Sequence, residues 1–521
     1  MDGTSAKGAD FDLLIIGGGI NGAGIARDAA GRGLSVLLCE QDDLAAHTSS
    51  ASTKLVHGGL RYLEYCHFGL VRKALAEREV LLRAAPHIIR PLRFIMPLGP
   101  GSRPAWLIRL GLFIYDHLGG RDLLPASRSV DLRRHHGGAA LRPEIRRGFV
   151  YSDCWVEDSR LVVINAMDAR ERGATIRPRT IVTAARREGG NWLVTLRDAR
   201  GTTTNRIRAR SLVNAAGPWV ATVLDSIGDV TPSHRRVRLV KGSHIIVRSL
   251  FDHGDAYVFQ NPDRRIVFAI PFEEAFTLIG TTDVPFSGDP AGVTISAGEV
   301  DYLCAAVNRY LASPITAADV IRGYAGVRPL QDDAATDAAT VTRDYVLELD
   351  APPGVAPLLS VFGGKITTYR RLAEEALALL GPPLGVPDRP WTTSPPLPGG
   401  DIPAADTGAW LAGFRQRHPY LPEPLARRYA GSYGTRAEIL LAGATCLADL
   451  GTHLGDGIHS AELAYLARQE WAQTADDVLW RRSRLGLHVH AETRRAVEAW
   501  FRHHDIQPRE WRRTACENPP G

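Results

Sequence analysis

The chain has 521 residues, 45% of them hydrophobic and 23% charged, with a formal net charge of +5. This is ordinary composition for a globular protein of two or three domains. No apolar run reaches 18 residues and the start lacks the apolar centre of an export signal, so we expect neither a spanning helix nor secretion. Six cysteines without a C-x-x-C pair argue against zinc, iron–sulfur clusters and disulfides. We therefore expect a cytoplasmic protein without a metal site.

The first motif is the segment 11–24, which reads FDLLIIGGGINGAG. An apolar strand ends in Gly17, Gly19 and Gly22, spaced G-x-G-x-x-G. These glycines permit a tight turn, close approach of backbone to a pyrophosphate, and close helix–strand packing. A helix and a second apolar run follow, and Glu40 at the end of that run can accept hydrogen bonds from ribose hydroxyls. The motif predicts a dinucleotide site but does not separate FAD from NAD, and a tight turn without a ligand is the alternative.

The next segment, TSSASTKLVHGGLRYLE at 48–64, has neither strand alternation nor helical spacing. Ser49 and Ser50 can offer hydroxyl and N–H groups to a cofactor. His57 precedes two glycines, which let the backbone approach a flat ring. Arg61 and Tyr62 are suited to holding an anion. Alone, the segment would be interpreted as a polar surface loop, but its place after the second strand favours the redox end of a cofactor site.

At these residues the chain resembles the FAD-dependent glycerol-3-phosphate dehydrogenases of the bacterial aerobic and mitochondrial type. Matching segments occur in order along nearly the whole chain and include IIGGGINGAGIARDAAGRGLSVLL, TSSASTKLVHGGLRYLE, LRPEIRRGFVYSDCWVEDSRL, LVNAAGPW, KGSHI, IGTTDVPFSGDP, GVRPL, TRDY, SVFGGKITTYRRLAE and ADDVLWRR. Each could arise by chance, whereas their joint order is specific. The resemblance implies that FAD is the cofactor and that sn-glycerol 3-phosphate is oxidised to dihydroxyacetone phosphate.

Two later arginines follow strand-like segments, Arg328 in GYAGVRPL and Arg343 in VTRDY. A phosphate with nearly two negative charges needs several cations, and an arginine fork supplies two parallel charge-assisted bonds. The resemblance implies that Arg328 and Arg343 line the substrate pocket with His57, Arg61 and Tyr62. Without that context, each arginine would be interpreted as a surface salt-bridge residue.

The segment from Ser360, SVFGGKITTYRRLAEEALALL, is a second glycine turn that enters an amphipathic helix. Gly363 and Gly364 let the backbone approach a ring, and Thr367 and Thr368 mark the helix start. That helix start and Lys365 would stabilise the negative charge of a reduced flavin. A nicotinamide has no such need, so the segment favours FAD; a plain capped helix is the alternative.

Two further strand ends are candidate cofactor contacts. In LVNAAGPW, Ala215 and Gly217 would let the chain pass beside the cofactor, although a strand ending in a glycine turn explains them too. Val182 in TIVTAA would place backbone against the adenine.

In the implied reaction, the C2 hydrogen of the substrate leaves as a hydride to the flavin while the C2 hydroxyl loses its proton. His57 is our first candidate for the base because an unperturbed imidazole titrates near neutrality. The alternative is that His57 only contacts the flavin ring. Arg328 and Lys365 are candidates to stabilise the developing alkoxide.

The expected fold is α/β, with a Rossmann-like FAD-binding domain, an antiparallel β substrate domain and a C-terminal helical cap domain. The first two are interleaved within 1–390. FAD-binding segments are expected at about 10–80, 155–240 and 325–390, and the substrate sheet at about 241–325. A Pro/Gly-rich linker follows Arg389, and 391–521 has helical patterning.

The resemblance also implies a membrane quinone as electron acceptor, reached by a protein bound peripherally to the cytoplasmic face of the inner membrane. The segment 104–118, with arginines in and near it, is either an interfacial basic helix or a buried one. A homodimer is the candidate assembly. Nucleic-acid binding is not expected, because the arginines are dispersed and no motif that reads DNA or RNA occurs.

Three other functions remain open on sequence alone. The first is a glycerol-3-phosphate oxidase that uses oxygen. The second is another flavoenzyme of the amino- and hydroxy-acid oxidase fold. The third is a nucleotide-binding sensor without catalytic activity, although the crowded polar residues at 48–64 argue against it.

Overall fold

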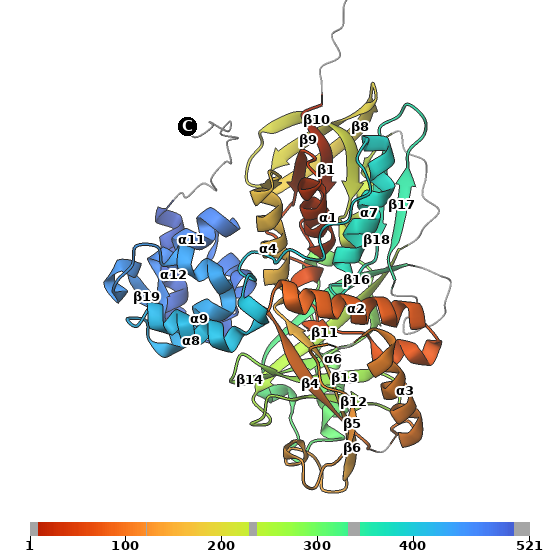
Figure 1. The fold of residues 1–521 in the computed structure, drawn as a ribbon, viewed down its shortest axis with the longest axis vertical. Coiled ribbons are helices and arrows are strands. Elements are labelled where there is room, and N and C mark those ends of the chain that lie inside the picture. The colour runs from red at the N-terminus through yellow and green to blue at the C-terminus, as the bar shows by residue number, and fades with distance from the viewer. Residues whose placement is uncertain (1–8, 100, 121, 229–236, 332–343, 505–521) are drawn as a thin grey trace, which may run out of the picture.

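The computed structural model describes residues 9–99, 101–120, 122–228, 237–331 and 344–504. It contains two large sheets, and the first of them is Rossmann-like (Figure 1). Its parallel part runs in the order β18-β10-β1-β2-β7, flanked by the antiparallel strand β17 and by the β8–β9–β10 meander. The strands are β1 (Phe11–Ile16), β2 (Val36–Cys39), β7 (Thr175–Arg177), β8 (Thr180–Glu188), β9 (Asn191–Asp198), β10 (Thr204–Asn214), β17 (Val346–Asp350) and β18 (Leu358–Phe362). The predicted strand–helix–strand unit at the N-terminus is confirmed.

Helices cover this sheet because its parallel strands are apolar on both faces. The sequence FDLLII of β1 is buried from its third residue onward. Figure 1 shows α1 (Ile20–Gly31) beside α4 (Asp158–Glu171) and α7 (Tyr369–Leu384), which α1 contacts. The short helix α5 (Val220–Ser226) follows β10. The close packing of α1 against α7 requires Gly24, since a Cβ at that position would lie 2.7 Å from the ring of Tyr369.

The second sheet is antiparallel apart from the parallel pair β12–β4. It runs β15-β11-β14-β13-β12-β4-β6-β3, with β16 paired to β11 and β5 to β6. The strands are β3 (Leu55–Val56), β4 (Ile89–Pro97), β5 (Arg128–Asp131), β6 (Arg147–Val156), β11 (Val237–Arg248), β12 (Ala256–Gln260), β13 (Ile266–Phe272), β14 (Phe276–Gly280), β15 (Val284–Pro285) and β16 (Val320–Gln331). The sheet expected at 241–325 is therefore only part of the observed one, which also uses strands from the first 156 residues.

Three helices accompany the second sheet: α2 (Phe68–Ala84), α3 (Ala105–Leu118) and α6 (Ala297–Asn308). The segment 104–118 is thus helical, and α3 lies at the outside of the lower part of the molecule in Figure 1. Within the described residues, none of the helices is long and apolar enough to cross a bilayer.

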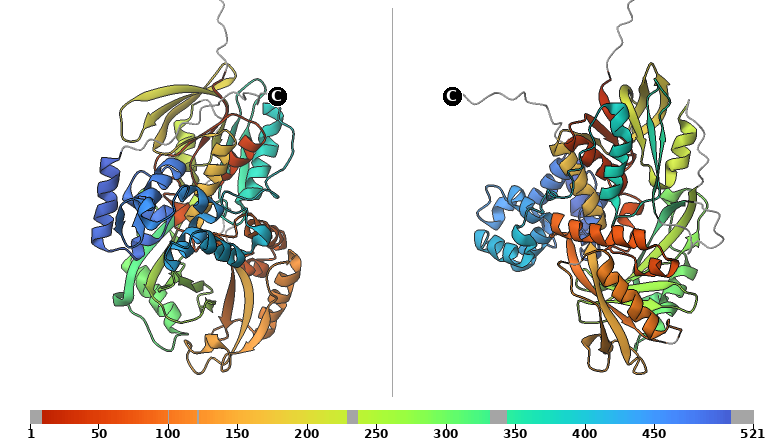
Figure 2. Two further views of the ribbon diagram at one scale, coloured as in Figure 1. Left: turned by 60° about the vertical axis from the view of Figure 1, so that its left-hand side comes forward. Right: turned by 45° about the vertical axis from the view of Figure 1, so that its right-hand side comes forward.

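The C-terminal domain is helical (Figure 2), and it has its own hydrophobic core. It comprises α8 (Thr407–Arg417), α9 (Glu423–Tyr433), α10 (Ala437–Leu440), α11 (Ser460–Glu470) and α12 (Ala491–His503), with a small hairpin of β19 (His453–Gly455) and β20 (Ile458–His459). Buried ion pairs join it to the first sheet and α4: Arg482 with Asp43, and Arg484 with Asp158.

Candidate functional site

The turn between β1 and α1 has the backbone geometry that a dinucleotide requires. Gly17 has a φ of 111°, and a Cβ at that position would lie 2.5 Å from the carbonyl oxygen of Ala215. A Cβ at Gly22 would lie 2.0 Å from the carbonyl oxygen of Gly17. The first glycine therefore brings the β1 and β10 ends together, and Gly22 packs α1 under the turn.

Glu40 stands at the end of β2, beside this turn. Its carboxylate accepts hydrogen bonds from the backbone N–H groups of Gly18 at 2.6 Å and Asp42 at 2.9 Å. Burial raises the pKa of the Glu40 carboxyl. Ile20 N–H donates to Ser49 Oγ at 3.0 Å, so Ser49 caps one of the unpaired amides at the start of α1.

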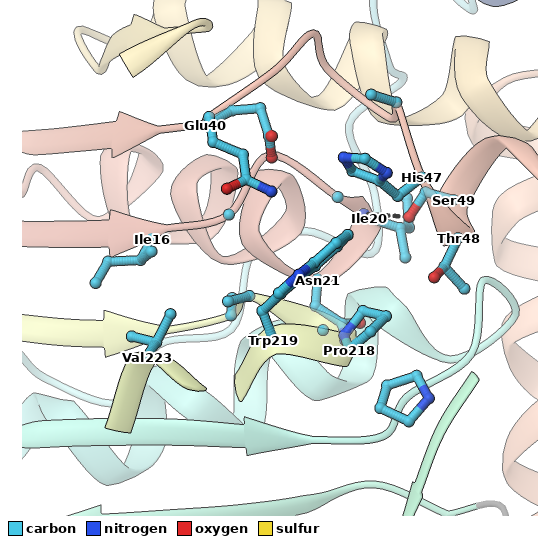
Figure 3. Close-up of a pocket in the computed structure, with 18 of the residues that line it drawn as sticks. Ile16, Ile20, Asn21, Glu40, His47, Thr48, Ser49, Pro218, Trp219 and Val223 are labelled. Atoms are coloured by element: carbon cyan, nitrogen blue, oxygen red, sulfur yellow. Dashed lines mark hydrogen bonds between the residues drawn. The ribbon is translucent and has the colours of Figure 1, made fainter. Parts of the chain in front are cut away.

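A cavity of about 980 Å³ opens at the carboxyl ends of these parallel strands, where a doubly wound sheet binds its ligand. Its lining includes nine residues that the sequence predicted for the cofactor: Gly17, Gly19, Glu40, Ser49, Val182, Ala215, Gly217, Gly363 and Gly364. Glu40 and His47 border the cavity on one side, and Pro218 and Trp219 on the other (Figure 3).

The sequence reasoning missed Asn21 and Trp219 in this lining. Asn21 Nδ2 donates to the carbonyl of Gly363 at 3.0 Å, which ties the first glycine turn to the second. Asn21 Oδ1 is buried without a hydrogen-bond partner among the described residues. The ring of Trp219 meets that of His47 edge-on, with centroids 4.6 Å apart. Asn21 could have been predicted, because it is the polar residue between the motif glycines. Nothing in the sequence AAGPW indicates that the indole of Trp219 lines the cavity.

These features fit a dinucleotide. The glycine turn leaves room for a pyrophosphate, and Glu40 can meet ribose hydroxyls.

A second cavity of about 1420 Å³ lies between η2 (Leu60–Tyr65), α3 and the second sheet. His57, Arg61 and Tyr62 line it, as do Thr281 and Asp283. The lining that α3 contributes is apolar: Leu107, Ile108, Leu110 and Ile114. The predicted anion-holding residues of 48–64 are thus brought to one cavity with an apolar wall.

Lys365 joins this group from more than 300 residues away. Its ammonium lies 4.1 Å from the ring centroid of Tyr62, a cation–π contact. Gly59 allows the approach, since it has a φ of 75° and a Cβ there would lie 2.4 Å from the Tyr62 ring. The N–H of His57 donates to Thr367 Oγ1 at 3.3 Å, so the start of α7 also holds the His57 backbone.

Arg328, on β16, is held beside the second cavity rather than in its lining. Its guanidinium donates to Asp283 Oδ1 at 2.6 Å, to the Thr282 carbonyl at 2.9 Å and to Thr281 Oγ1 at 3.2 Å. Gly242 leaves the space, because a Cβ there would lie 1.9 Å from Arg328 Nη2. Two residues that hold Arg328, Thr281 and Asp283, do line the cavity.

His244 is a buried residue of this region that sequence reasoning did not select. Its Nε2 lies 2.9 Å from Thr53 Oγ1, and its ring stacks on Tyr324 at 4.8 Å, which is its register partner on β16. Burial first, and then the positive charge of Arg328, lowers the pKa of His244 to about 3, so the ring is neutral at physiological pH. The segment KGSHI contains this histidine, but only the β11–β16 pairing brings it to Arg328.

The remaining predicted residues lie elsewhere. Ser50 lines neither of these cavities, and its hydroxyl donates to the His47 carbonyl at 3.1 Å. Thr367 and Thr368 are buried at the start of α7. Lys365 is placed by its contact with Tyr62, and Arg343 lies outside the described residues.

Comparison with known proteins decides the family. The family model described as "FAD dependent oxidoreductase" matches residues 12–370, and that described as "C-terminal domain of alpha-glycerophosphate oxidase" matches 391–503. A glycerol-3-phosphate dehydrogenase of Pseudomonas aeruginosa is 55% identical over 92% of this chain and 92% of its own. The chain belongs to the FAD-dependent glycerol-3-phosphate dehydrogenase family.

The same family includes a protein named for another substrate. A D-erythritol 1-phosphate dehydrogenase of Brucella abortus is 52% identical over 94% of this chain and 97% of its own. A solved glycerol-3-phosphate dehydrogenase of Bacillus halodurans, complexed with FAD, is 28% identical, covers 95% of this chain and 90% of its own, and has a TM-score of 0.77. FAD is thus the cofactor of the family, and the α/β fold with a helical C-terminal domain is confirmed.

Proposed function

We propose that this protein oxidises sn-glycerol 3-phosphate to dihydroxyacetone phosphate. One observation supports this most directly: Arg61 and Tyr62 line a cavity next to the dinucleotide site, and the ammonium of Lys365 lies over the Tyr62 ring. A phosphorylated polyol needs cations at one end and a redox group at the other. When bound, FAD accepts the hydride from C2 of the substrate.

The chain's own residues position the substrate and move its proton. Arg61 binds the phosphate, with Arg328 and Arg343 as further predicted contacts, so that C2 is held in one place. Lys365 stabilises negative charge that develops on the C2 oxygen. His57 takes the proton of the C2 hydroxyl, which leaves a carbonyl at C2.

D-Erythritol 1-phosphate is the second candidate substrate, favoured by the 52% identity to the Brucella abortus dehydrogenase. Both compounds are phosphorylated polyols, so the same arginines serve either. The test is kcat/KM of the holoenzyme for each compound with a soluble quinone analogue. We expect the higher value for sn-glycerol 3-phosphate, and a higher value for D-erythritol 1-phosphate would reassign the substrate.

A membrane quinone is the proposed electron acceptor. The apolar wall that α3 contributes to the second cavity suits a quinone ring. On the same helix, Trp106 and Phe113 are 70% and 53% exposed, which suits contact with a bilayer interface. We therefore propose peripheral binding through α3, and the family resemblance favours the cytoplasmic face of the inner membrane.

Oxygen as direct acceptor is the alternative, and peroxide release without quinone would identify it. A homodimer stays a prediction, which the mass of the purified protein tests.

A further inference from the structure

A third cavity, of about 1270 Å³, lies where the C-terminal domain meets both sheets. It shares a rim at 46–48 with the nucleotide cavity, but its far wall is formed by Arg322 and Tyr324 of β16 and by Trp480 and Arg494 of the C-terminal domain. Among the described residues, one carboxylate lines this cavity, that of Asp476. Five cations also line it: Lys54, Arg322, Arg481, Arg484 and Arg494.

Some of these charges are balanced within the protein. Lys54 pairs with Asp158 at 2.8 Å, as does Arg484 at 2.6 Å, and Arg481 pairs with Asp43 at 2.5 Å. These pairs explain why three cations lie here, and they need no ligand.

Arg322 and Arg494 are not balanced in this way. The Arg322 guanidinium lies 3.5 Å from the centroid of the Trp480 ring, and Arg322 forms no ion pair within the described part of the chain. Arg494 lies on the same indole at 5.7 Å, and its carboxylate contact is the exposed Asp476 at 3.4 Å. Burial, followed by the charge of Arg494, lowers the pKa of Arg322. Two guanidiniums thus share one aromatic ring with too little negative charge beside them.

Arg484 lines the same cavity, but carboxylates of the protein balance its charge. Its side chain is 9% exposed, and its guanidinium faces Asp158 at 2.6 Å and, through Nε, Glu157 at 3.5 Å. Cation–π stacking alone could explain Arg322. It does not explain why a second guanidinium, that of Arg494, is held against the same ring.

The geometry points to a binding site for a phosphate-bearing anion in this cavity, separate from the catalytic pocket. A phosphate oxygen pair matches a guanidinium fork, and Arg322 and Arg494 offer such donors from two domains. An anion held between Arg322 on β16 and Arg494 on α12 would tie the C-terminal domain to the second sheet. Tyr324 lies two residues after Arg322 on the same face of β16, and its ring stacks on that of His244. A ligand in this cavity would therefore also affect the catalytic region.

The test is calorimetric titration of the holoenzyme with inorganic pyrophosphate at about 0.15 M salt, where exposed charges are largely screened. We expect two classes of site in the wild type, one in this cavity and one in the catalytic pocket. Arg322→Gln and Arg494→Gln should each weaken one class by about tenfold or more. Arg495→Gln removes the same charge from the exposed neighbouring position of α12 and should bind as the wild type does.

Arg61→Gln provides the complementary variant, since it should weaken only the class that belongs to the catalytic pocket. Unchanged pyrophosphate binding in both Arg322→Gln and Arg494→Gln would overturn the proposal. So would a wild type with a single class of site that Arg61→Gln removes.

Discussion

The ammonium of Lys365 lies over the ring of Tyr62, 4.1 Å from its centroid, although 303 positions separate the two residues. The ring is presented by the turn after Gly59, and the lysine by the second glycine turn before α7. Since each turn belongs to a different chain segment, the contact marks the place where the nucleotide site meets the substrate cavity. The contact with the aromatic face holds the ammonium in one position beside that cavity.

We expect Lys365→Met to lower kcat for sn-glycerol 3-phosphate by about 10²–10³, the usual cost of removing a group that stabilises developing negative charge. Tyr62→Phe keeps the ring below the ammonium and should retain more activity than Tyr62→Ala. Steady-state kinetics on FAD-loaded protein measures both. A kcat close to wild type in Lys365→Met would remove this lysine from the chemistry.

Lys54 and Asp158 form a buried ion pair, with side chains 2% and 0% exposed. Lys54→Met leaves Arg484 as the remaining cation on the carboxylate, and we expect the free energy of unfolding to fall by about 3–5 kcal/mol. The matched variant is Lys73→Met, whose pair with Glu375 is partly exposed and should contribute about 0–1 kcal/mol. Equal shifts in urea unfolding midpoint for the two variants would contradict the distinction.

His87 predicts a pH dependence of stability. Both of its ring nitrogens are buried without a partner among the described residues, and burial first, then the charge of Arg160, lowers its pKa to about 3. Between about 3 and 6.5 the unfolded chain therefore binds more protons at this residue than the folded one. The contribution of neutral His87 to the free energy of unfolding is therefore complete above about pH 6.5 and is lost as the pH falls toward 3.

We accordingly expect His87→Phe to make the unfolding midpoint less sensitive to pH between 7 and 4 than it is in the wild type. The exposed His503→Gln is the control and should keep the wild-type slope. Identical slopes in all three proteins would show that His87 titrates normally in the fold.

The exposed face of α3 predicts membrane affinity. Replacing both Trp106 and Phe113 by glutamine should weaken binding to anionic phospholipid vesicles by about tenfold or more, since each buried ring contributes a few kcal/mol. Ile439→Gln, a 48% exposed apolar residue of the C-terminal domain, is the control. Co-sedimentation with vesicles measures the difference, and equal binding of all three proteins would place the contact elsewhere.

The sequence alone was sufficient to predict those elements whose structure depends on a short local pattern. The glycine turn of β1–α1 and the polar segment 48–64 could be assigned because spacing and composition act over few residues. The pairing of strands that are distant in the sequence could not be predicted from such local patterns. The β11–β16 register sets His244 against Tyr324, and the parallel pair β12–β4 draws residues 89–97 into the second sheet.

Arg328 illustrates the same limit at the site. Its position after a strand-like segment suggested a phosphate contact, and no local signal revealed that Asp283 already holds the guanidinium. Contacts of this kind follow from which strands pair, and that depends on the whole sheet.

The central claim is tested most directly by mixing the purified FAD-loaded protein with sn-glycerol 3-phosphate under anaerobic conditions and following flavin absorbance. We expect rapid, stoichiometric loss of the oxidised flavin band, with dihydroxyacetone phosphate as product. Persistence of the oxidised spectrum with sn-glycerol 3-phosphate, or bleaching by an amino acid or a hydroxy acid instead, would contradict it.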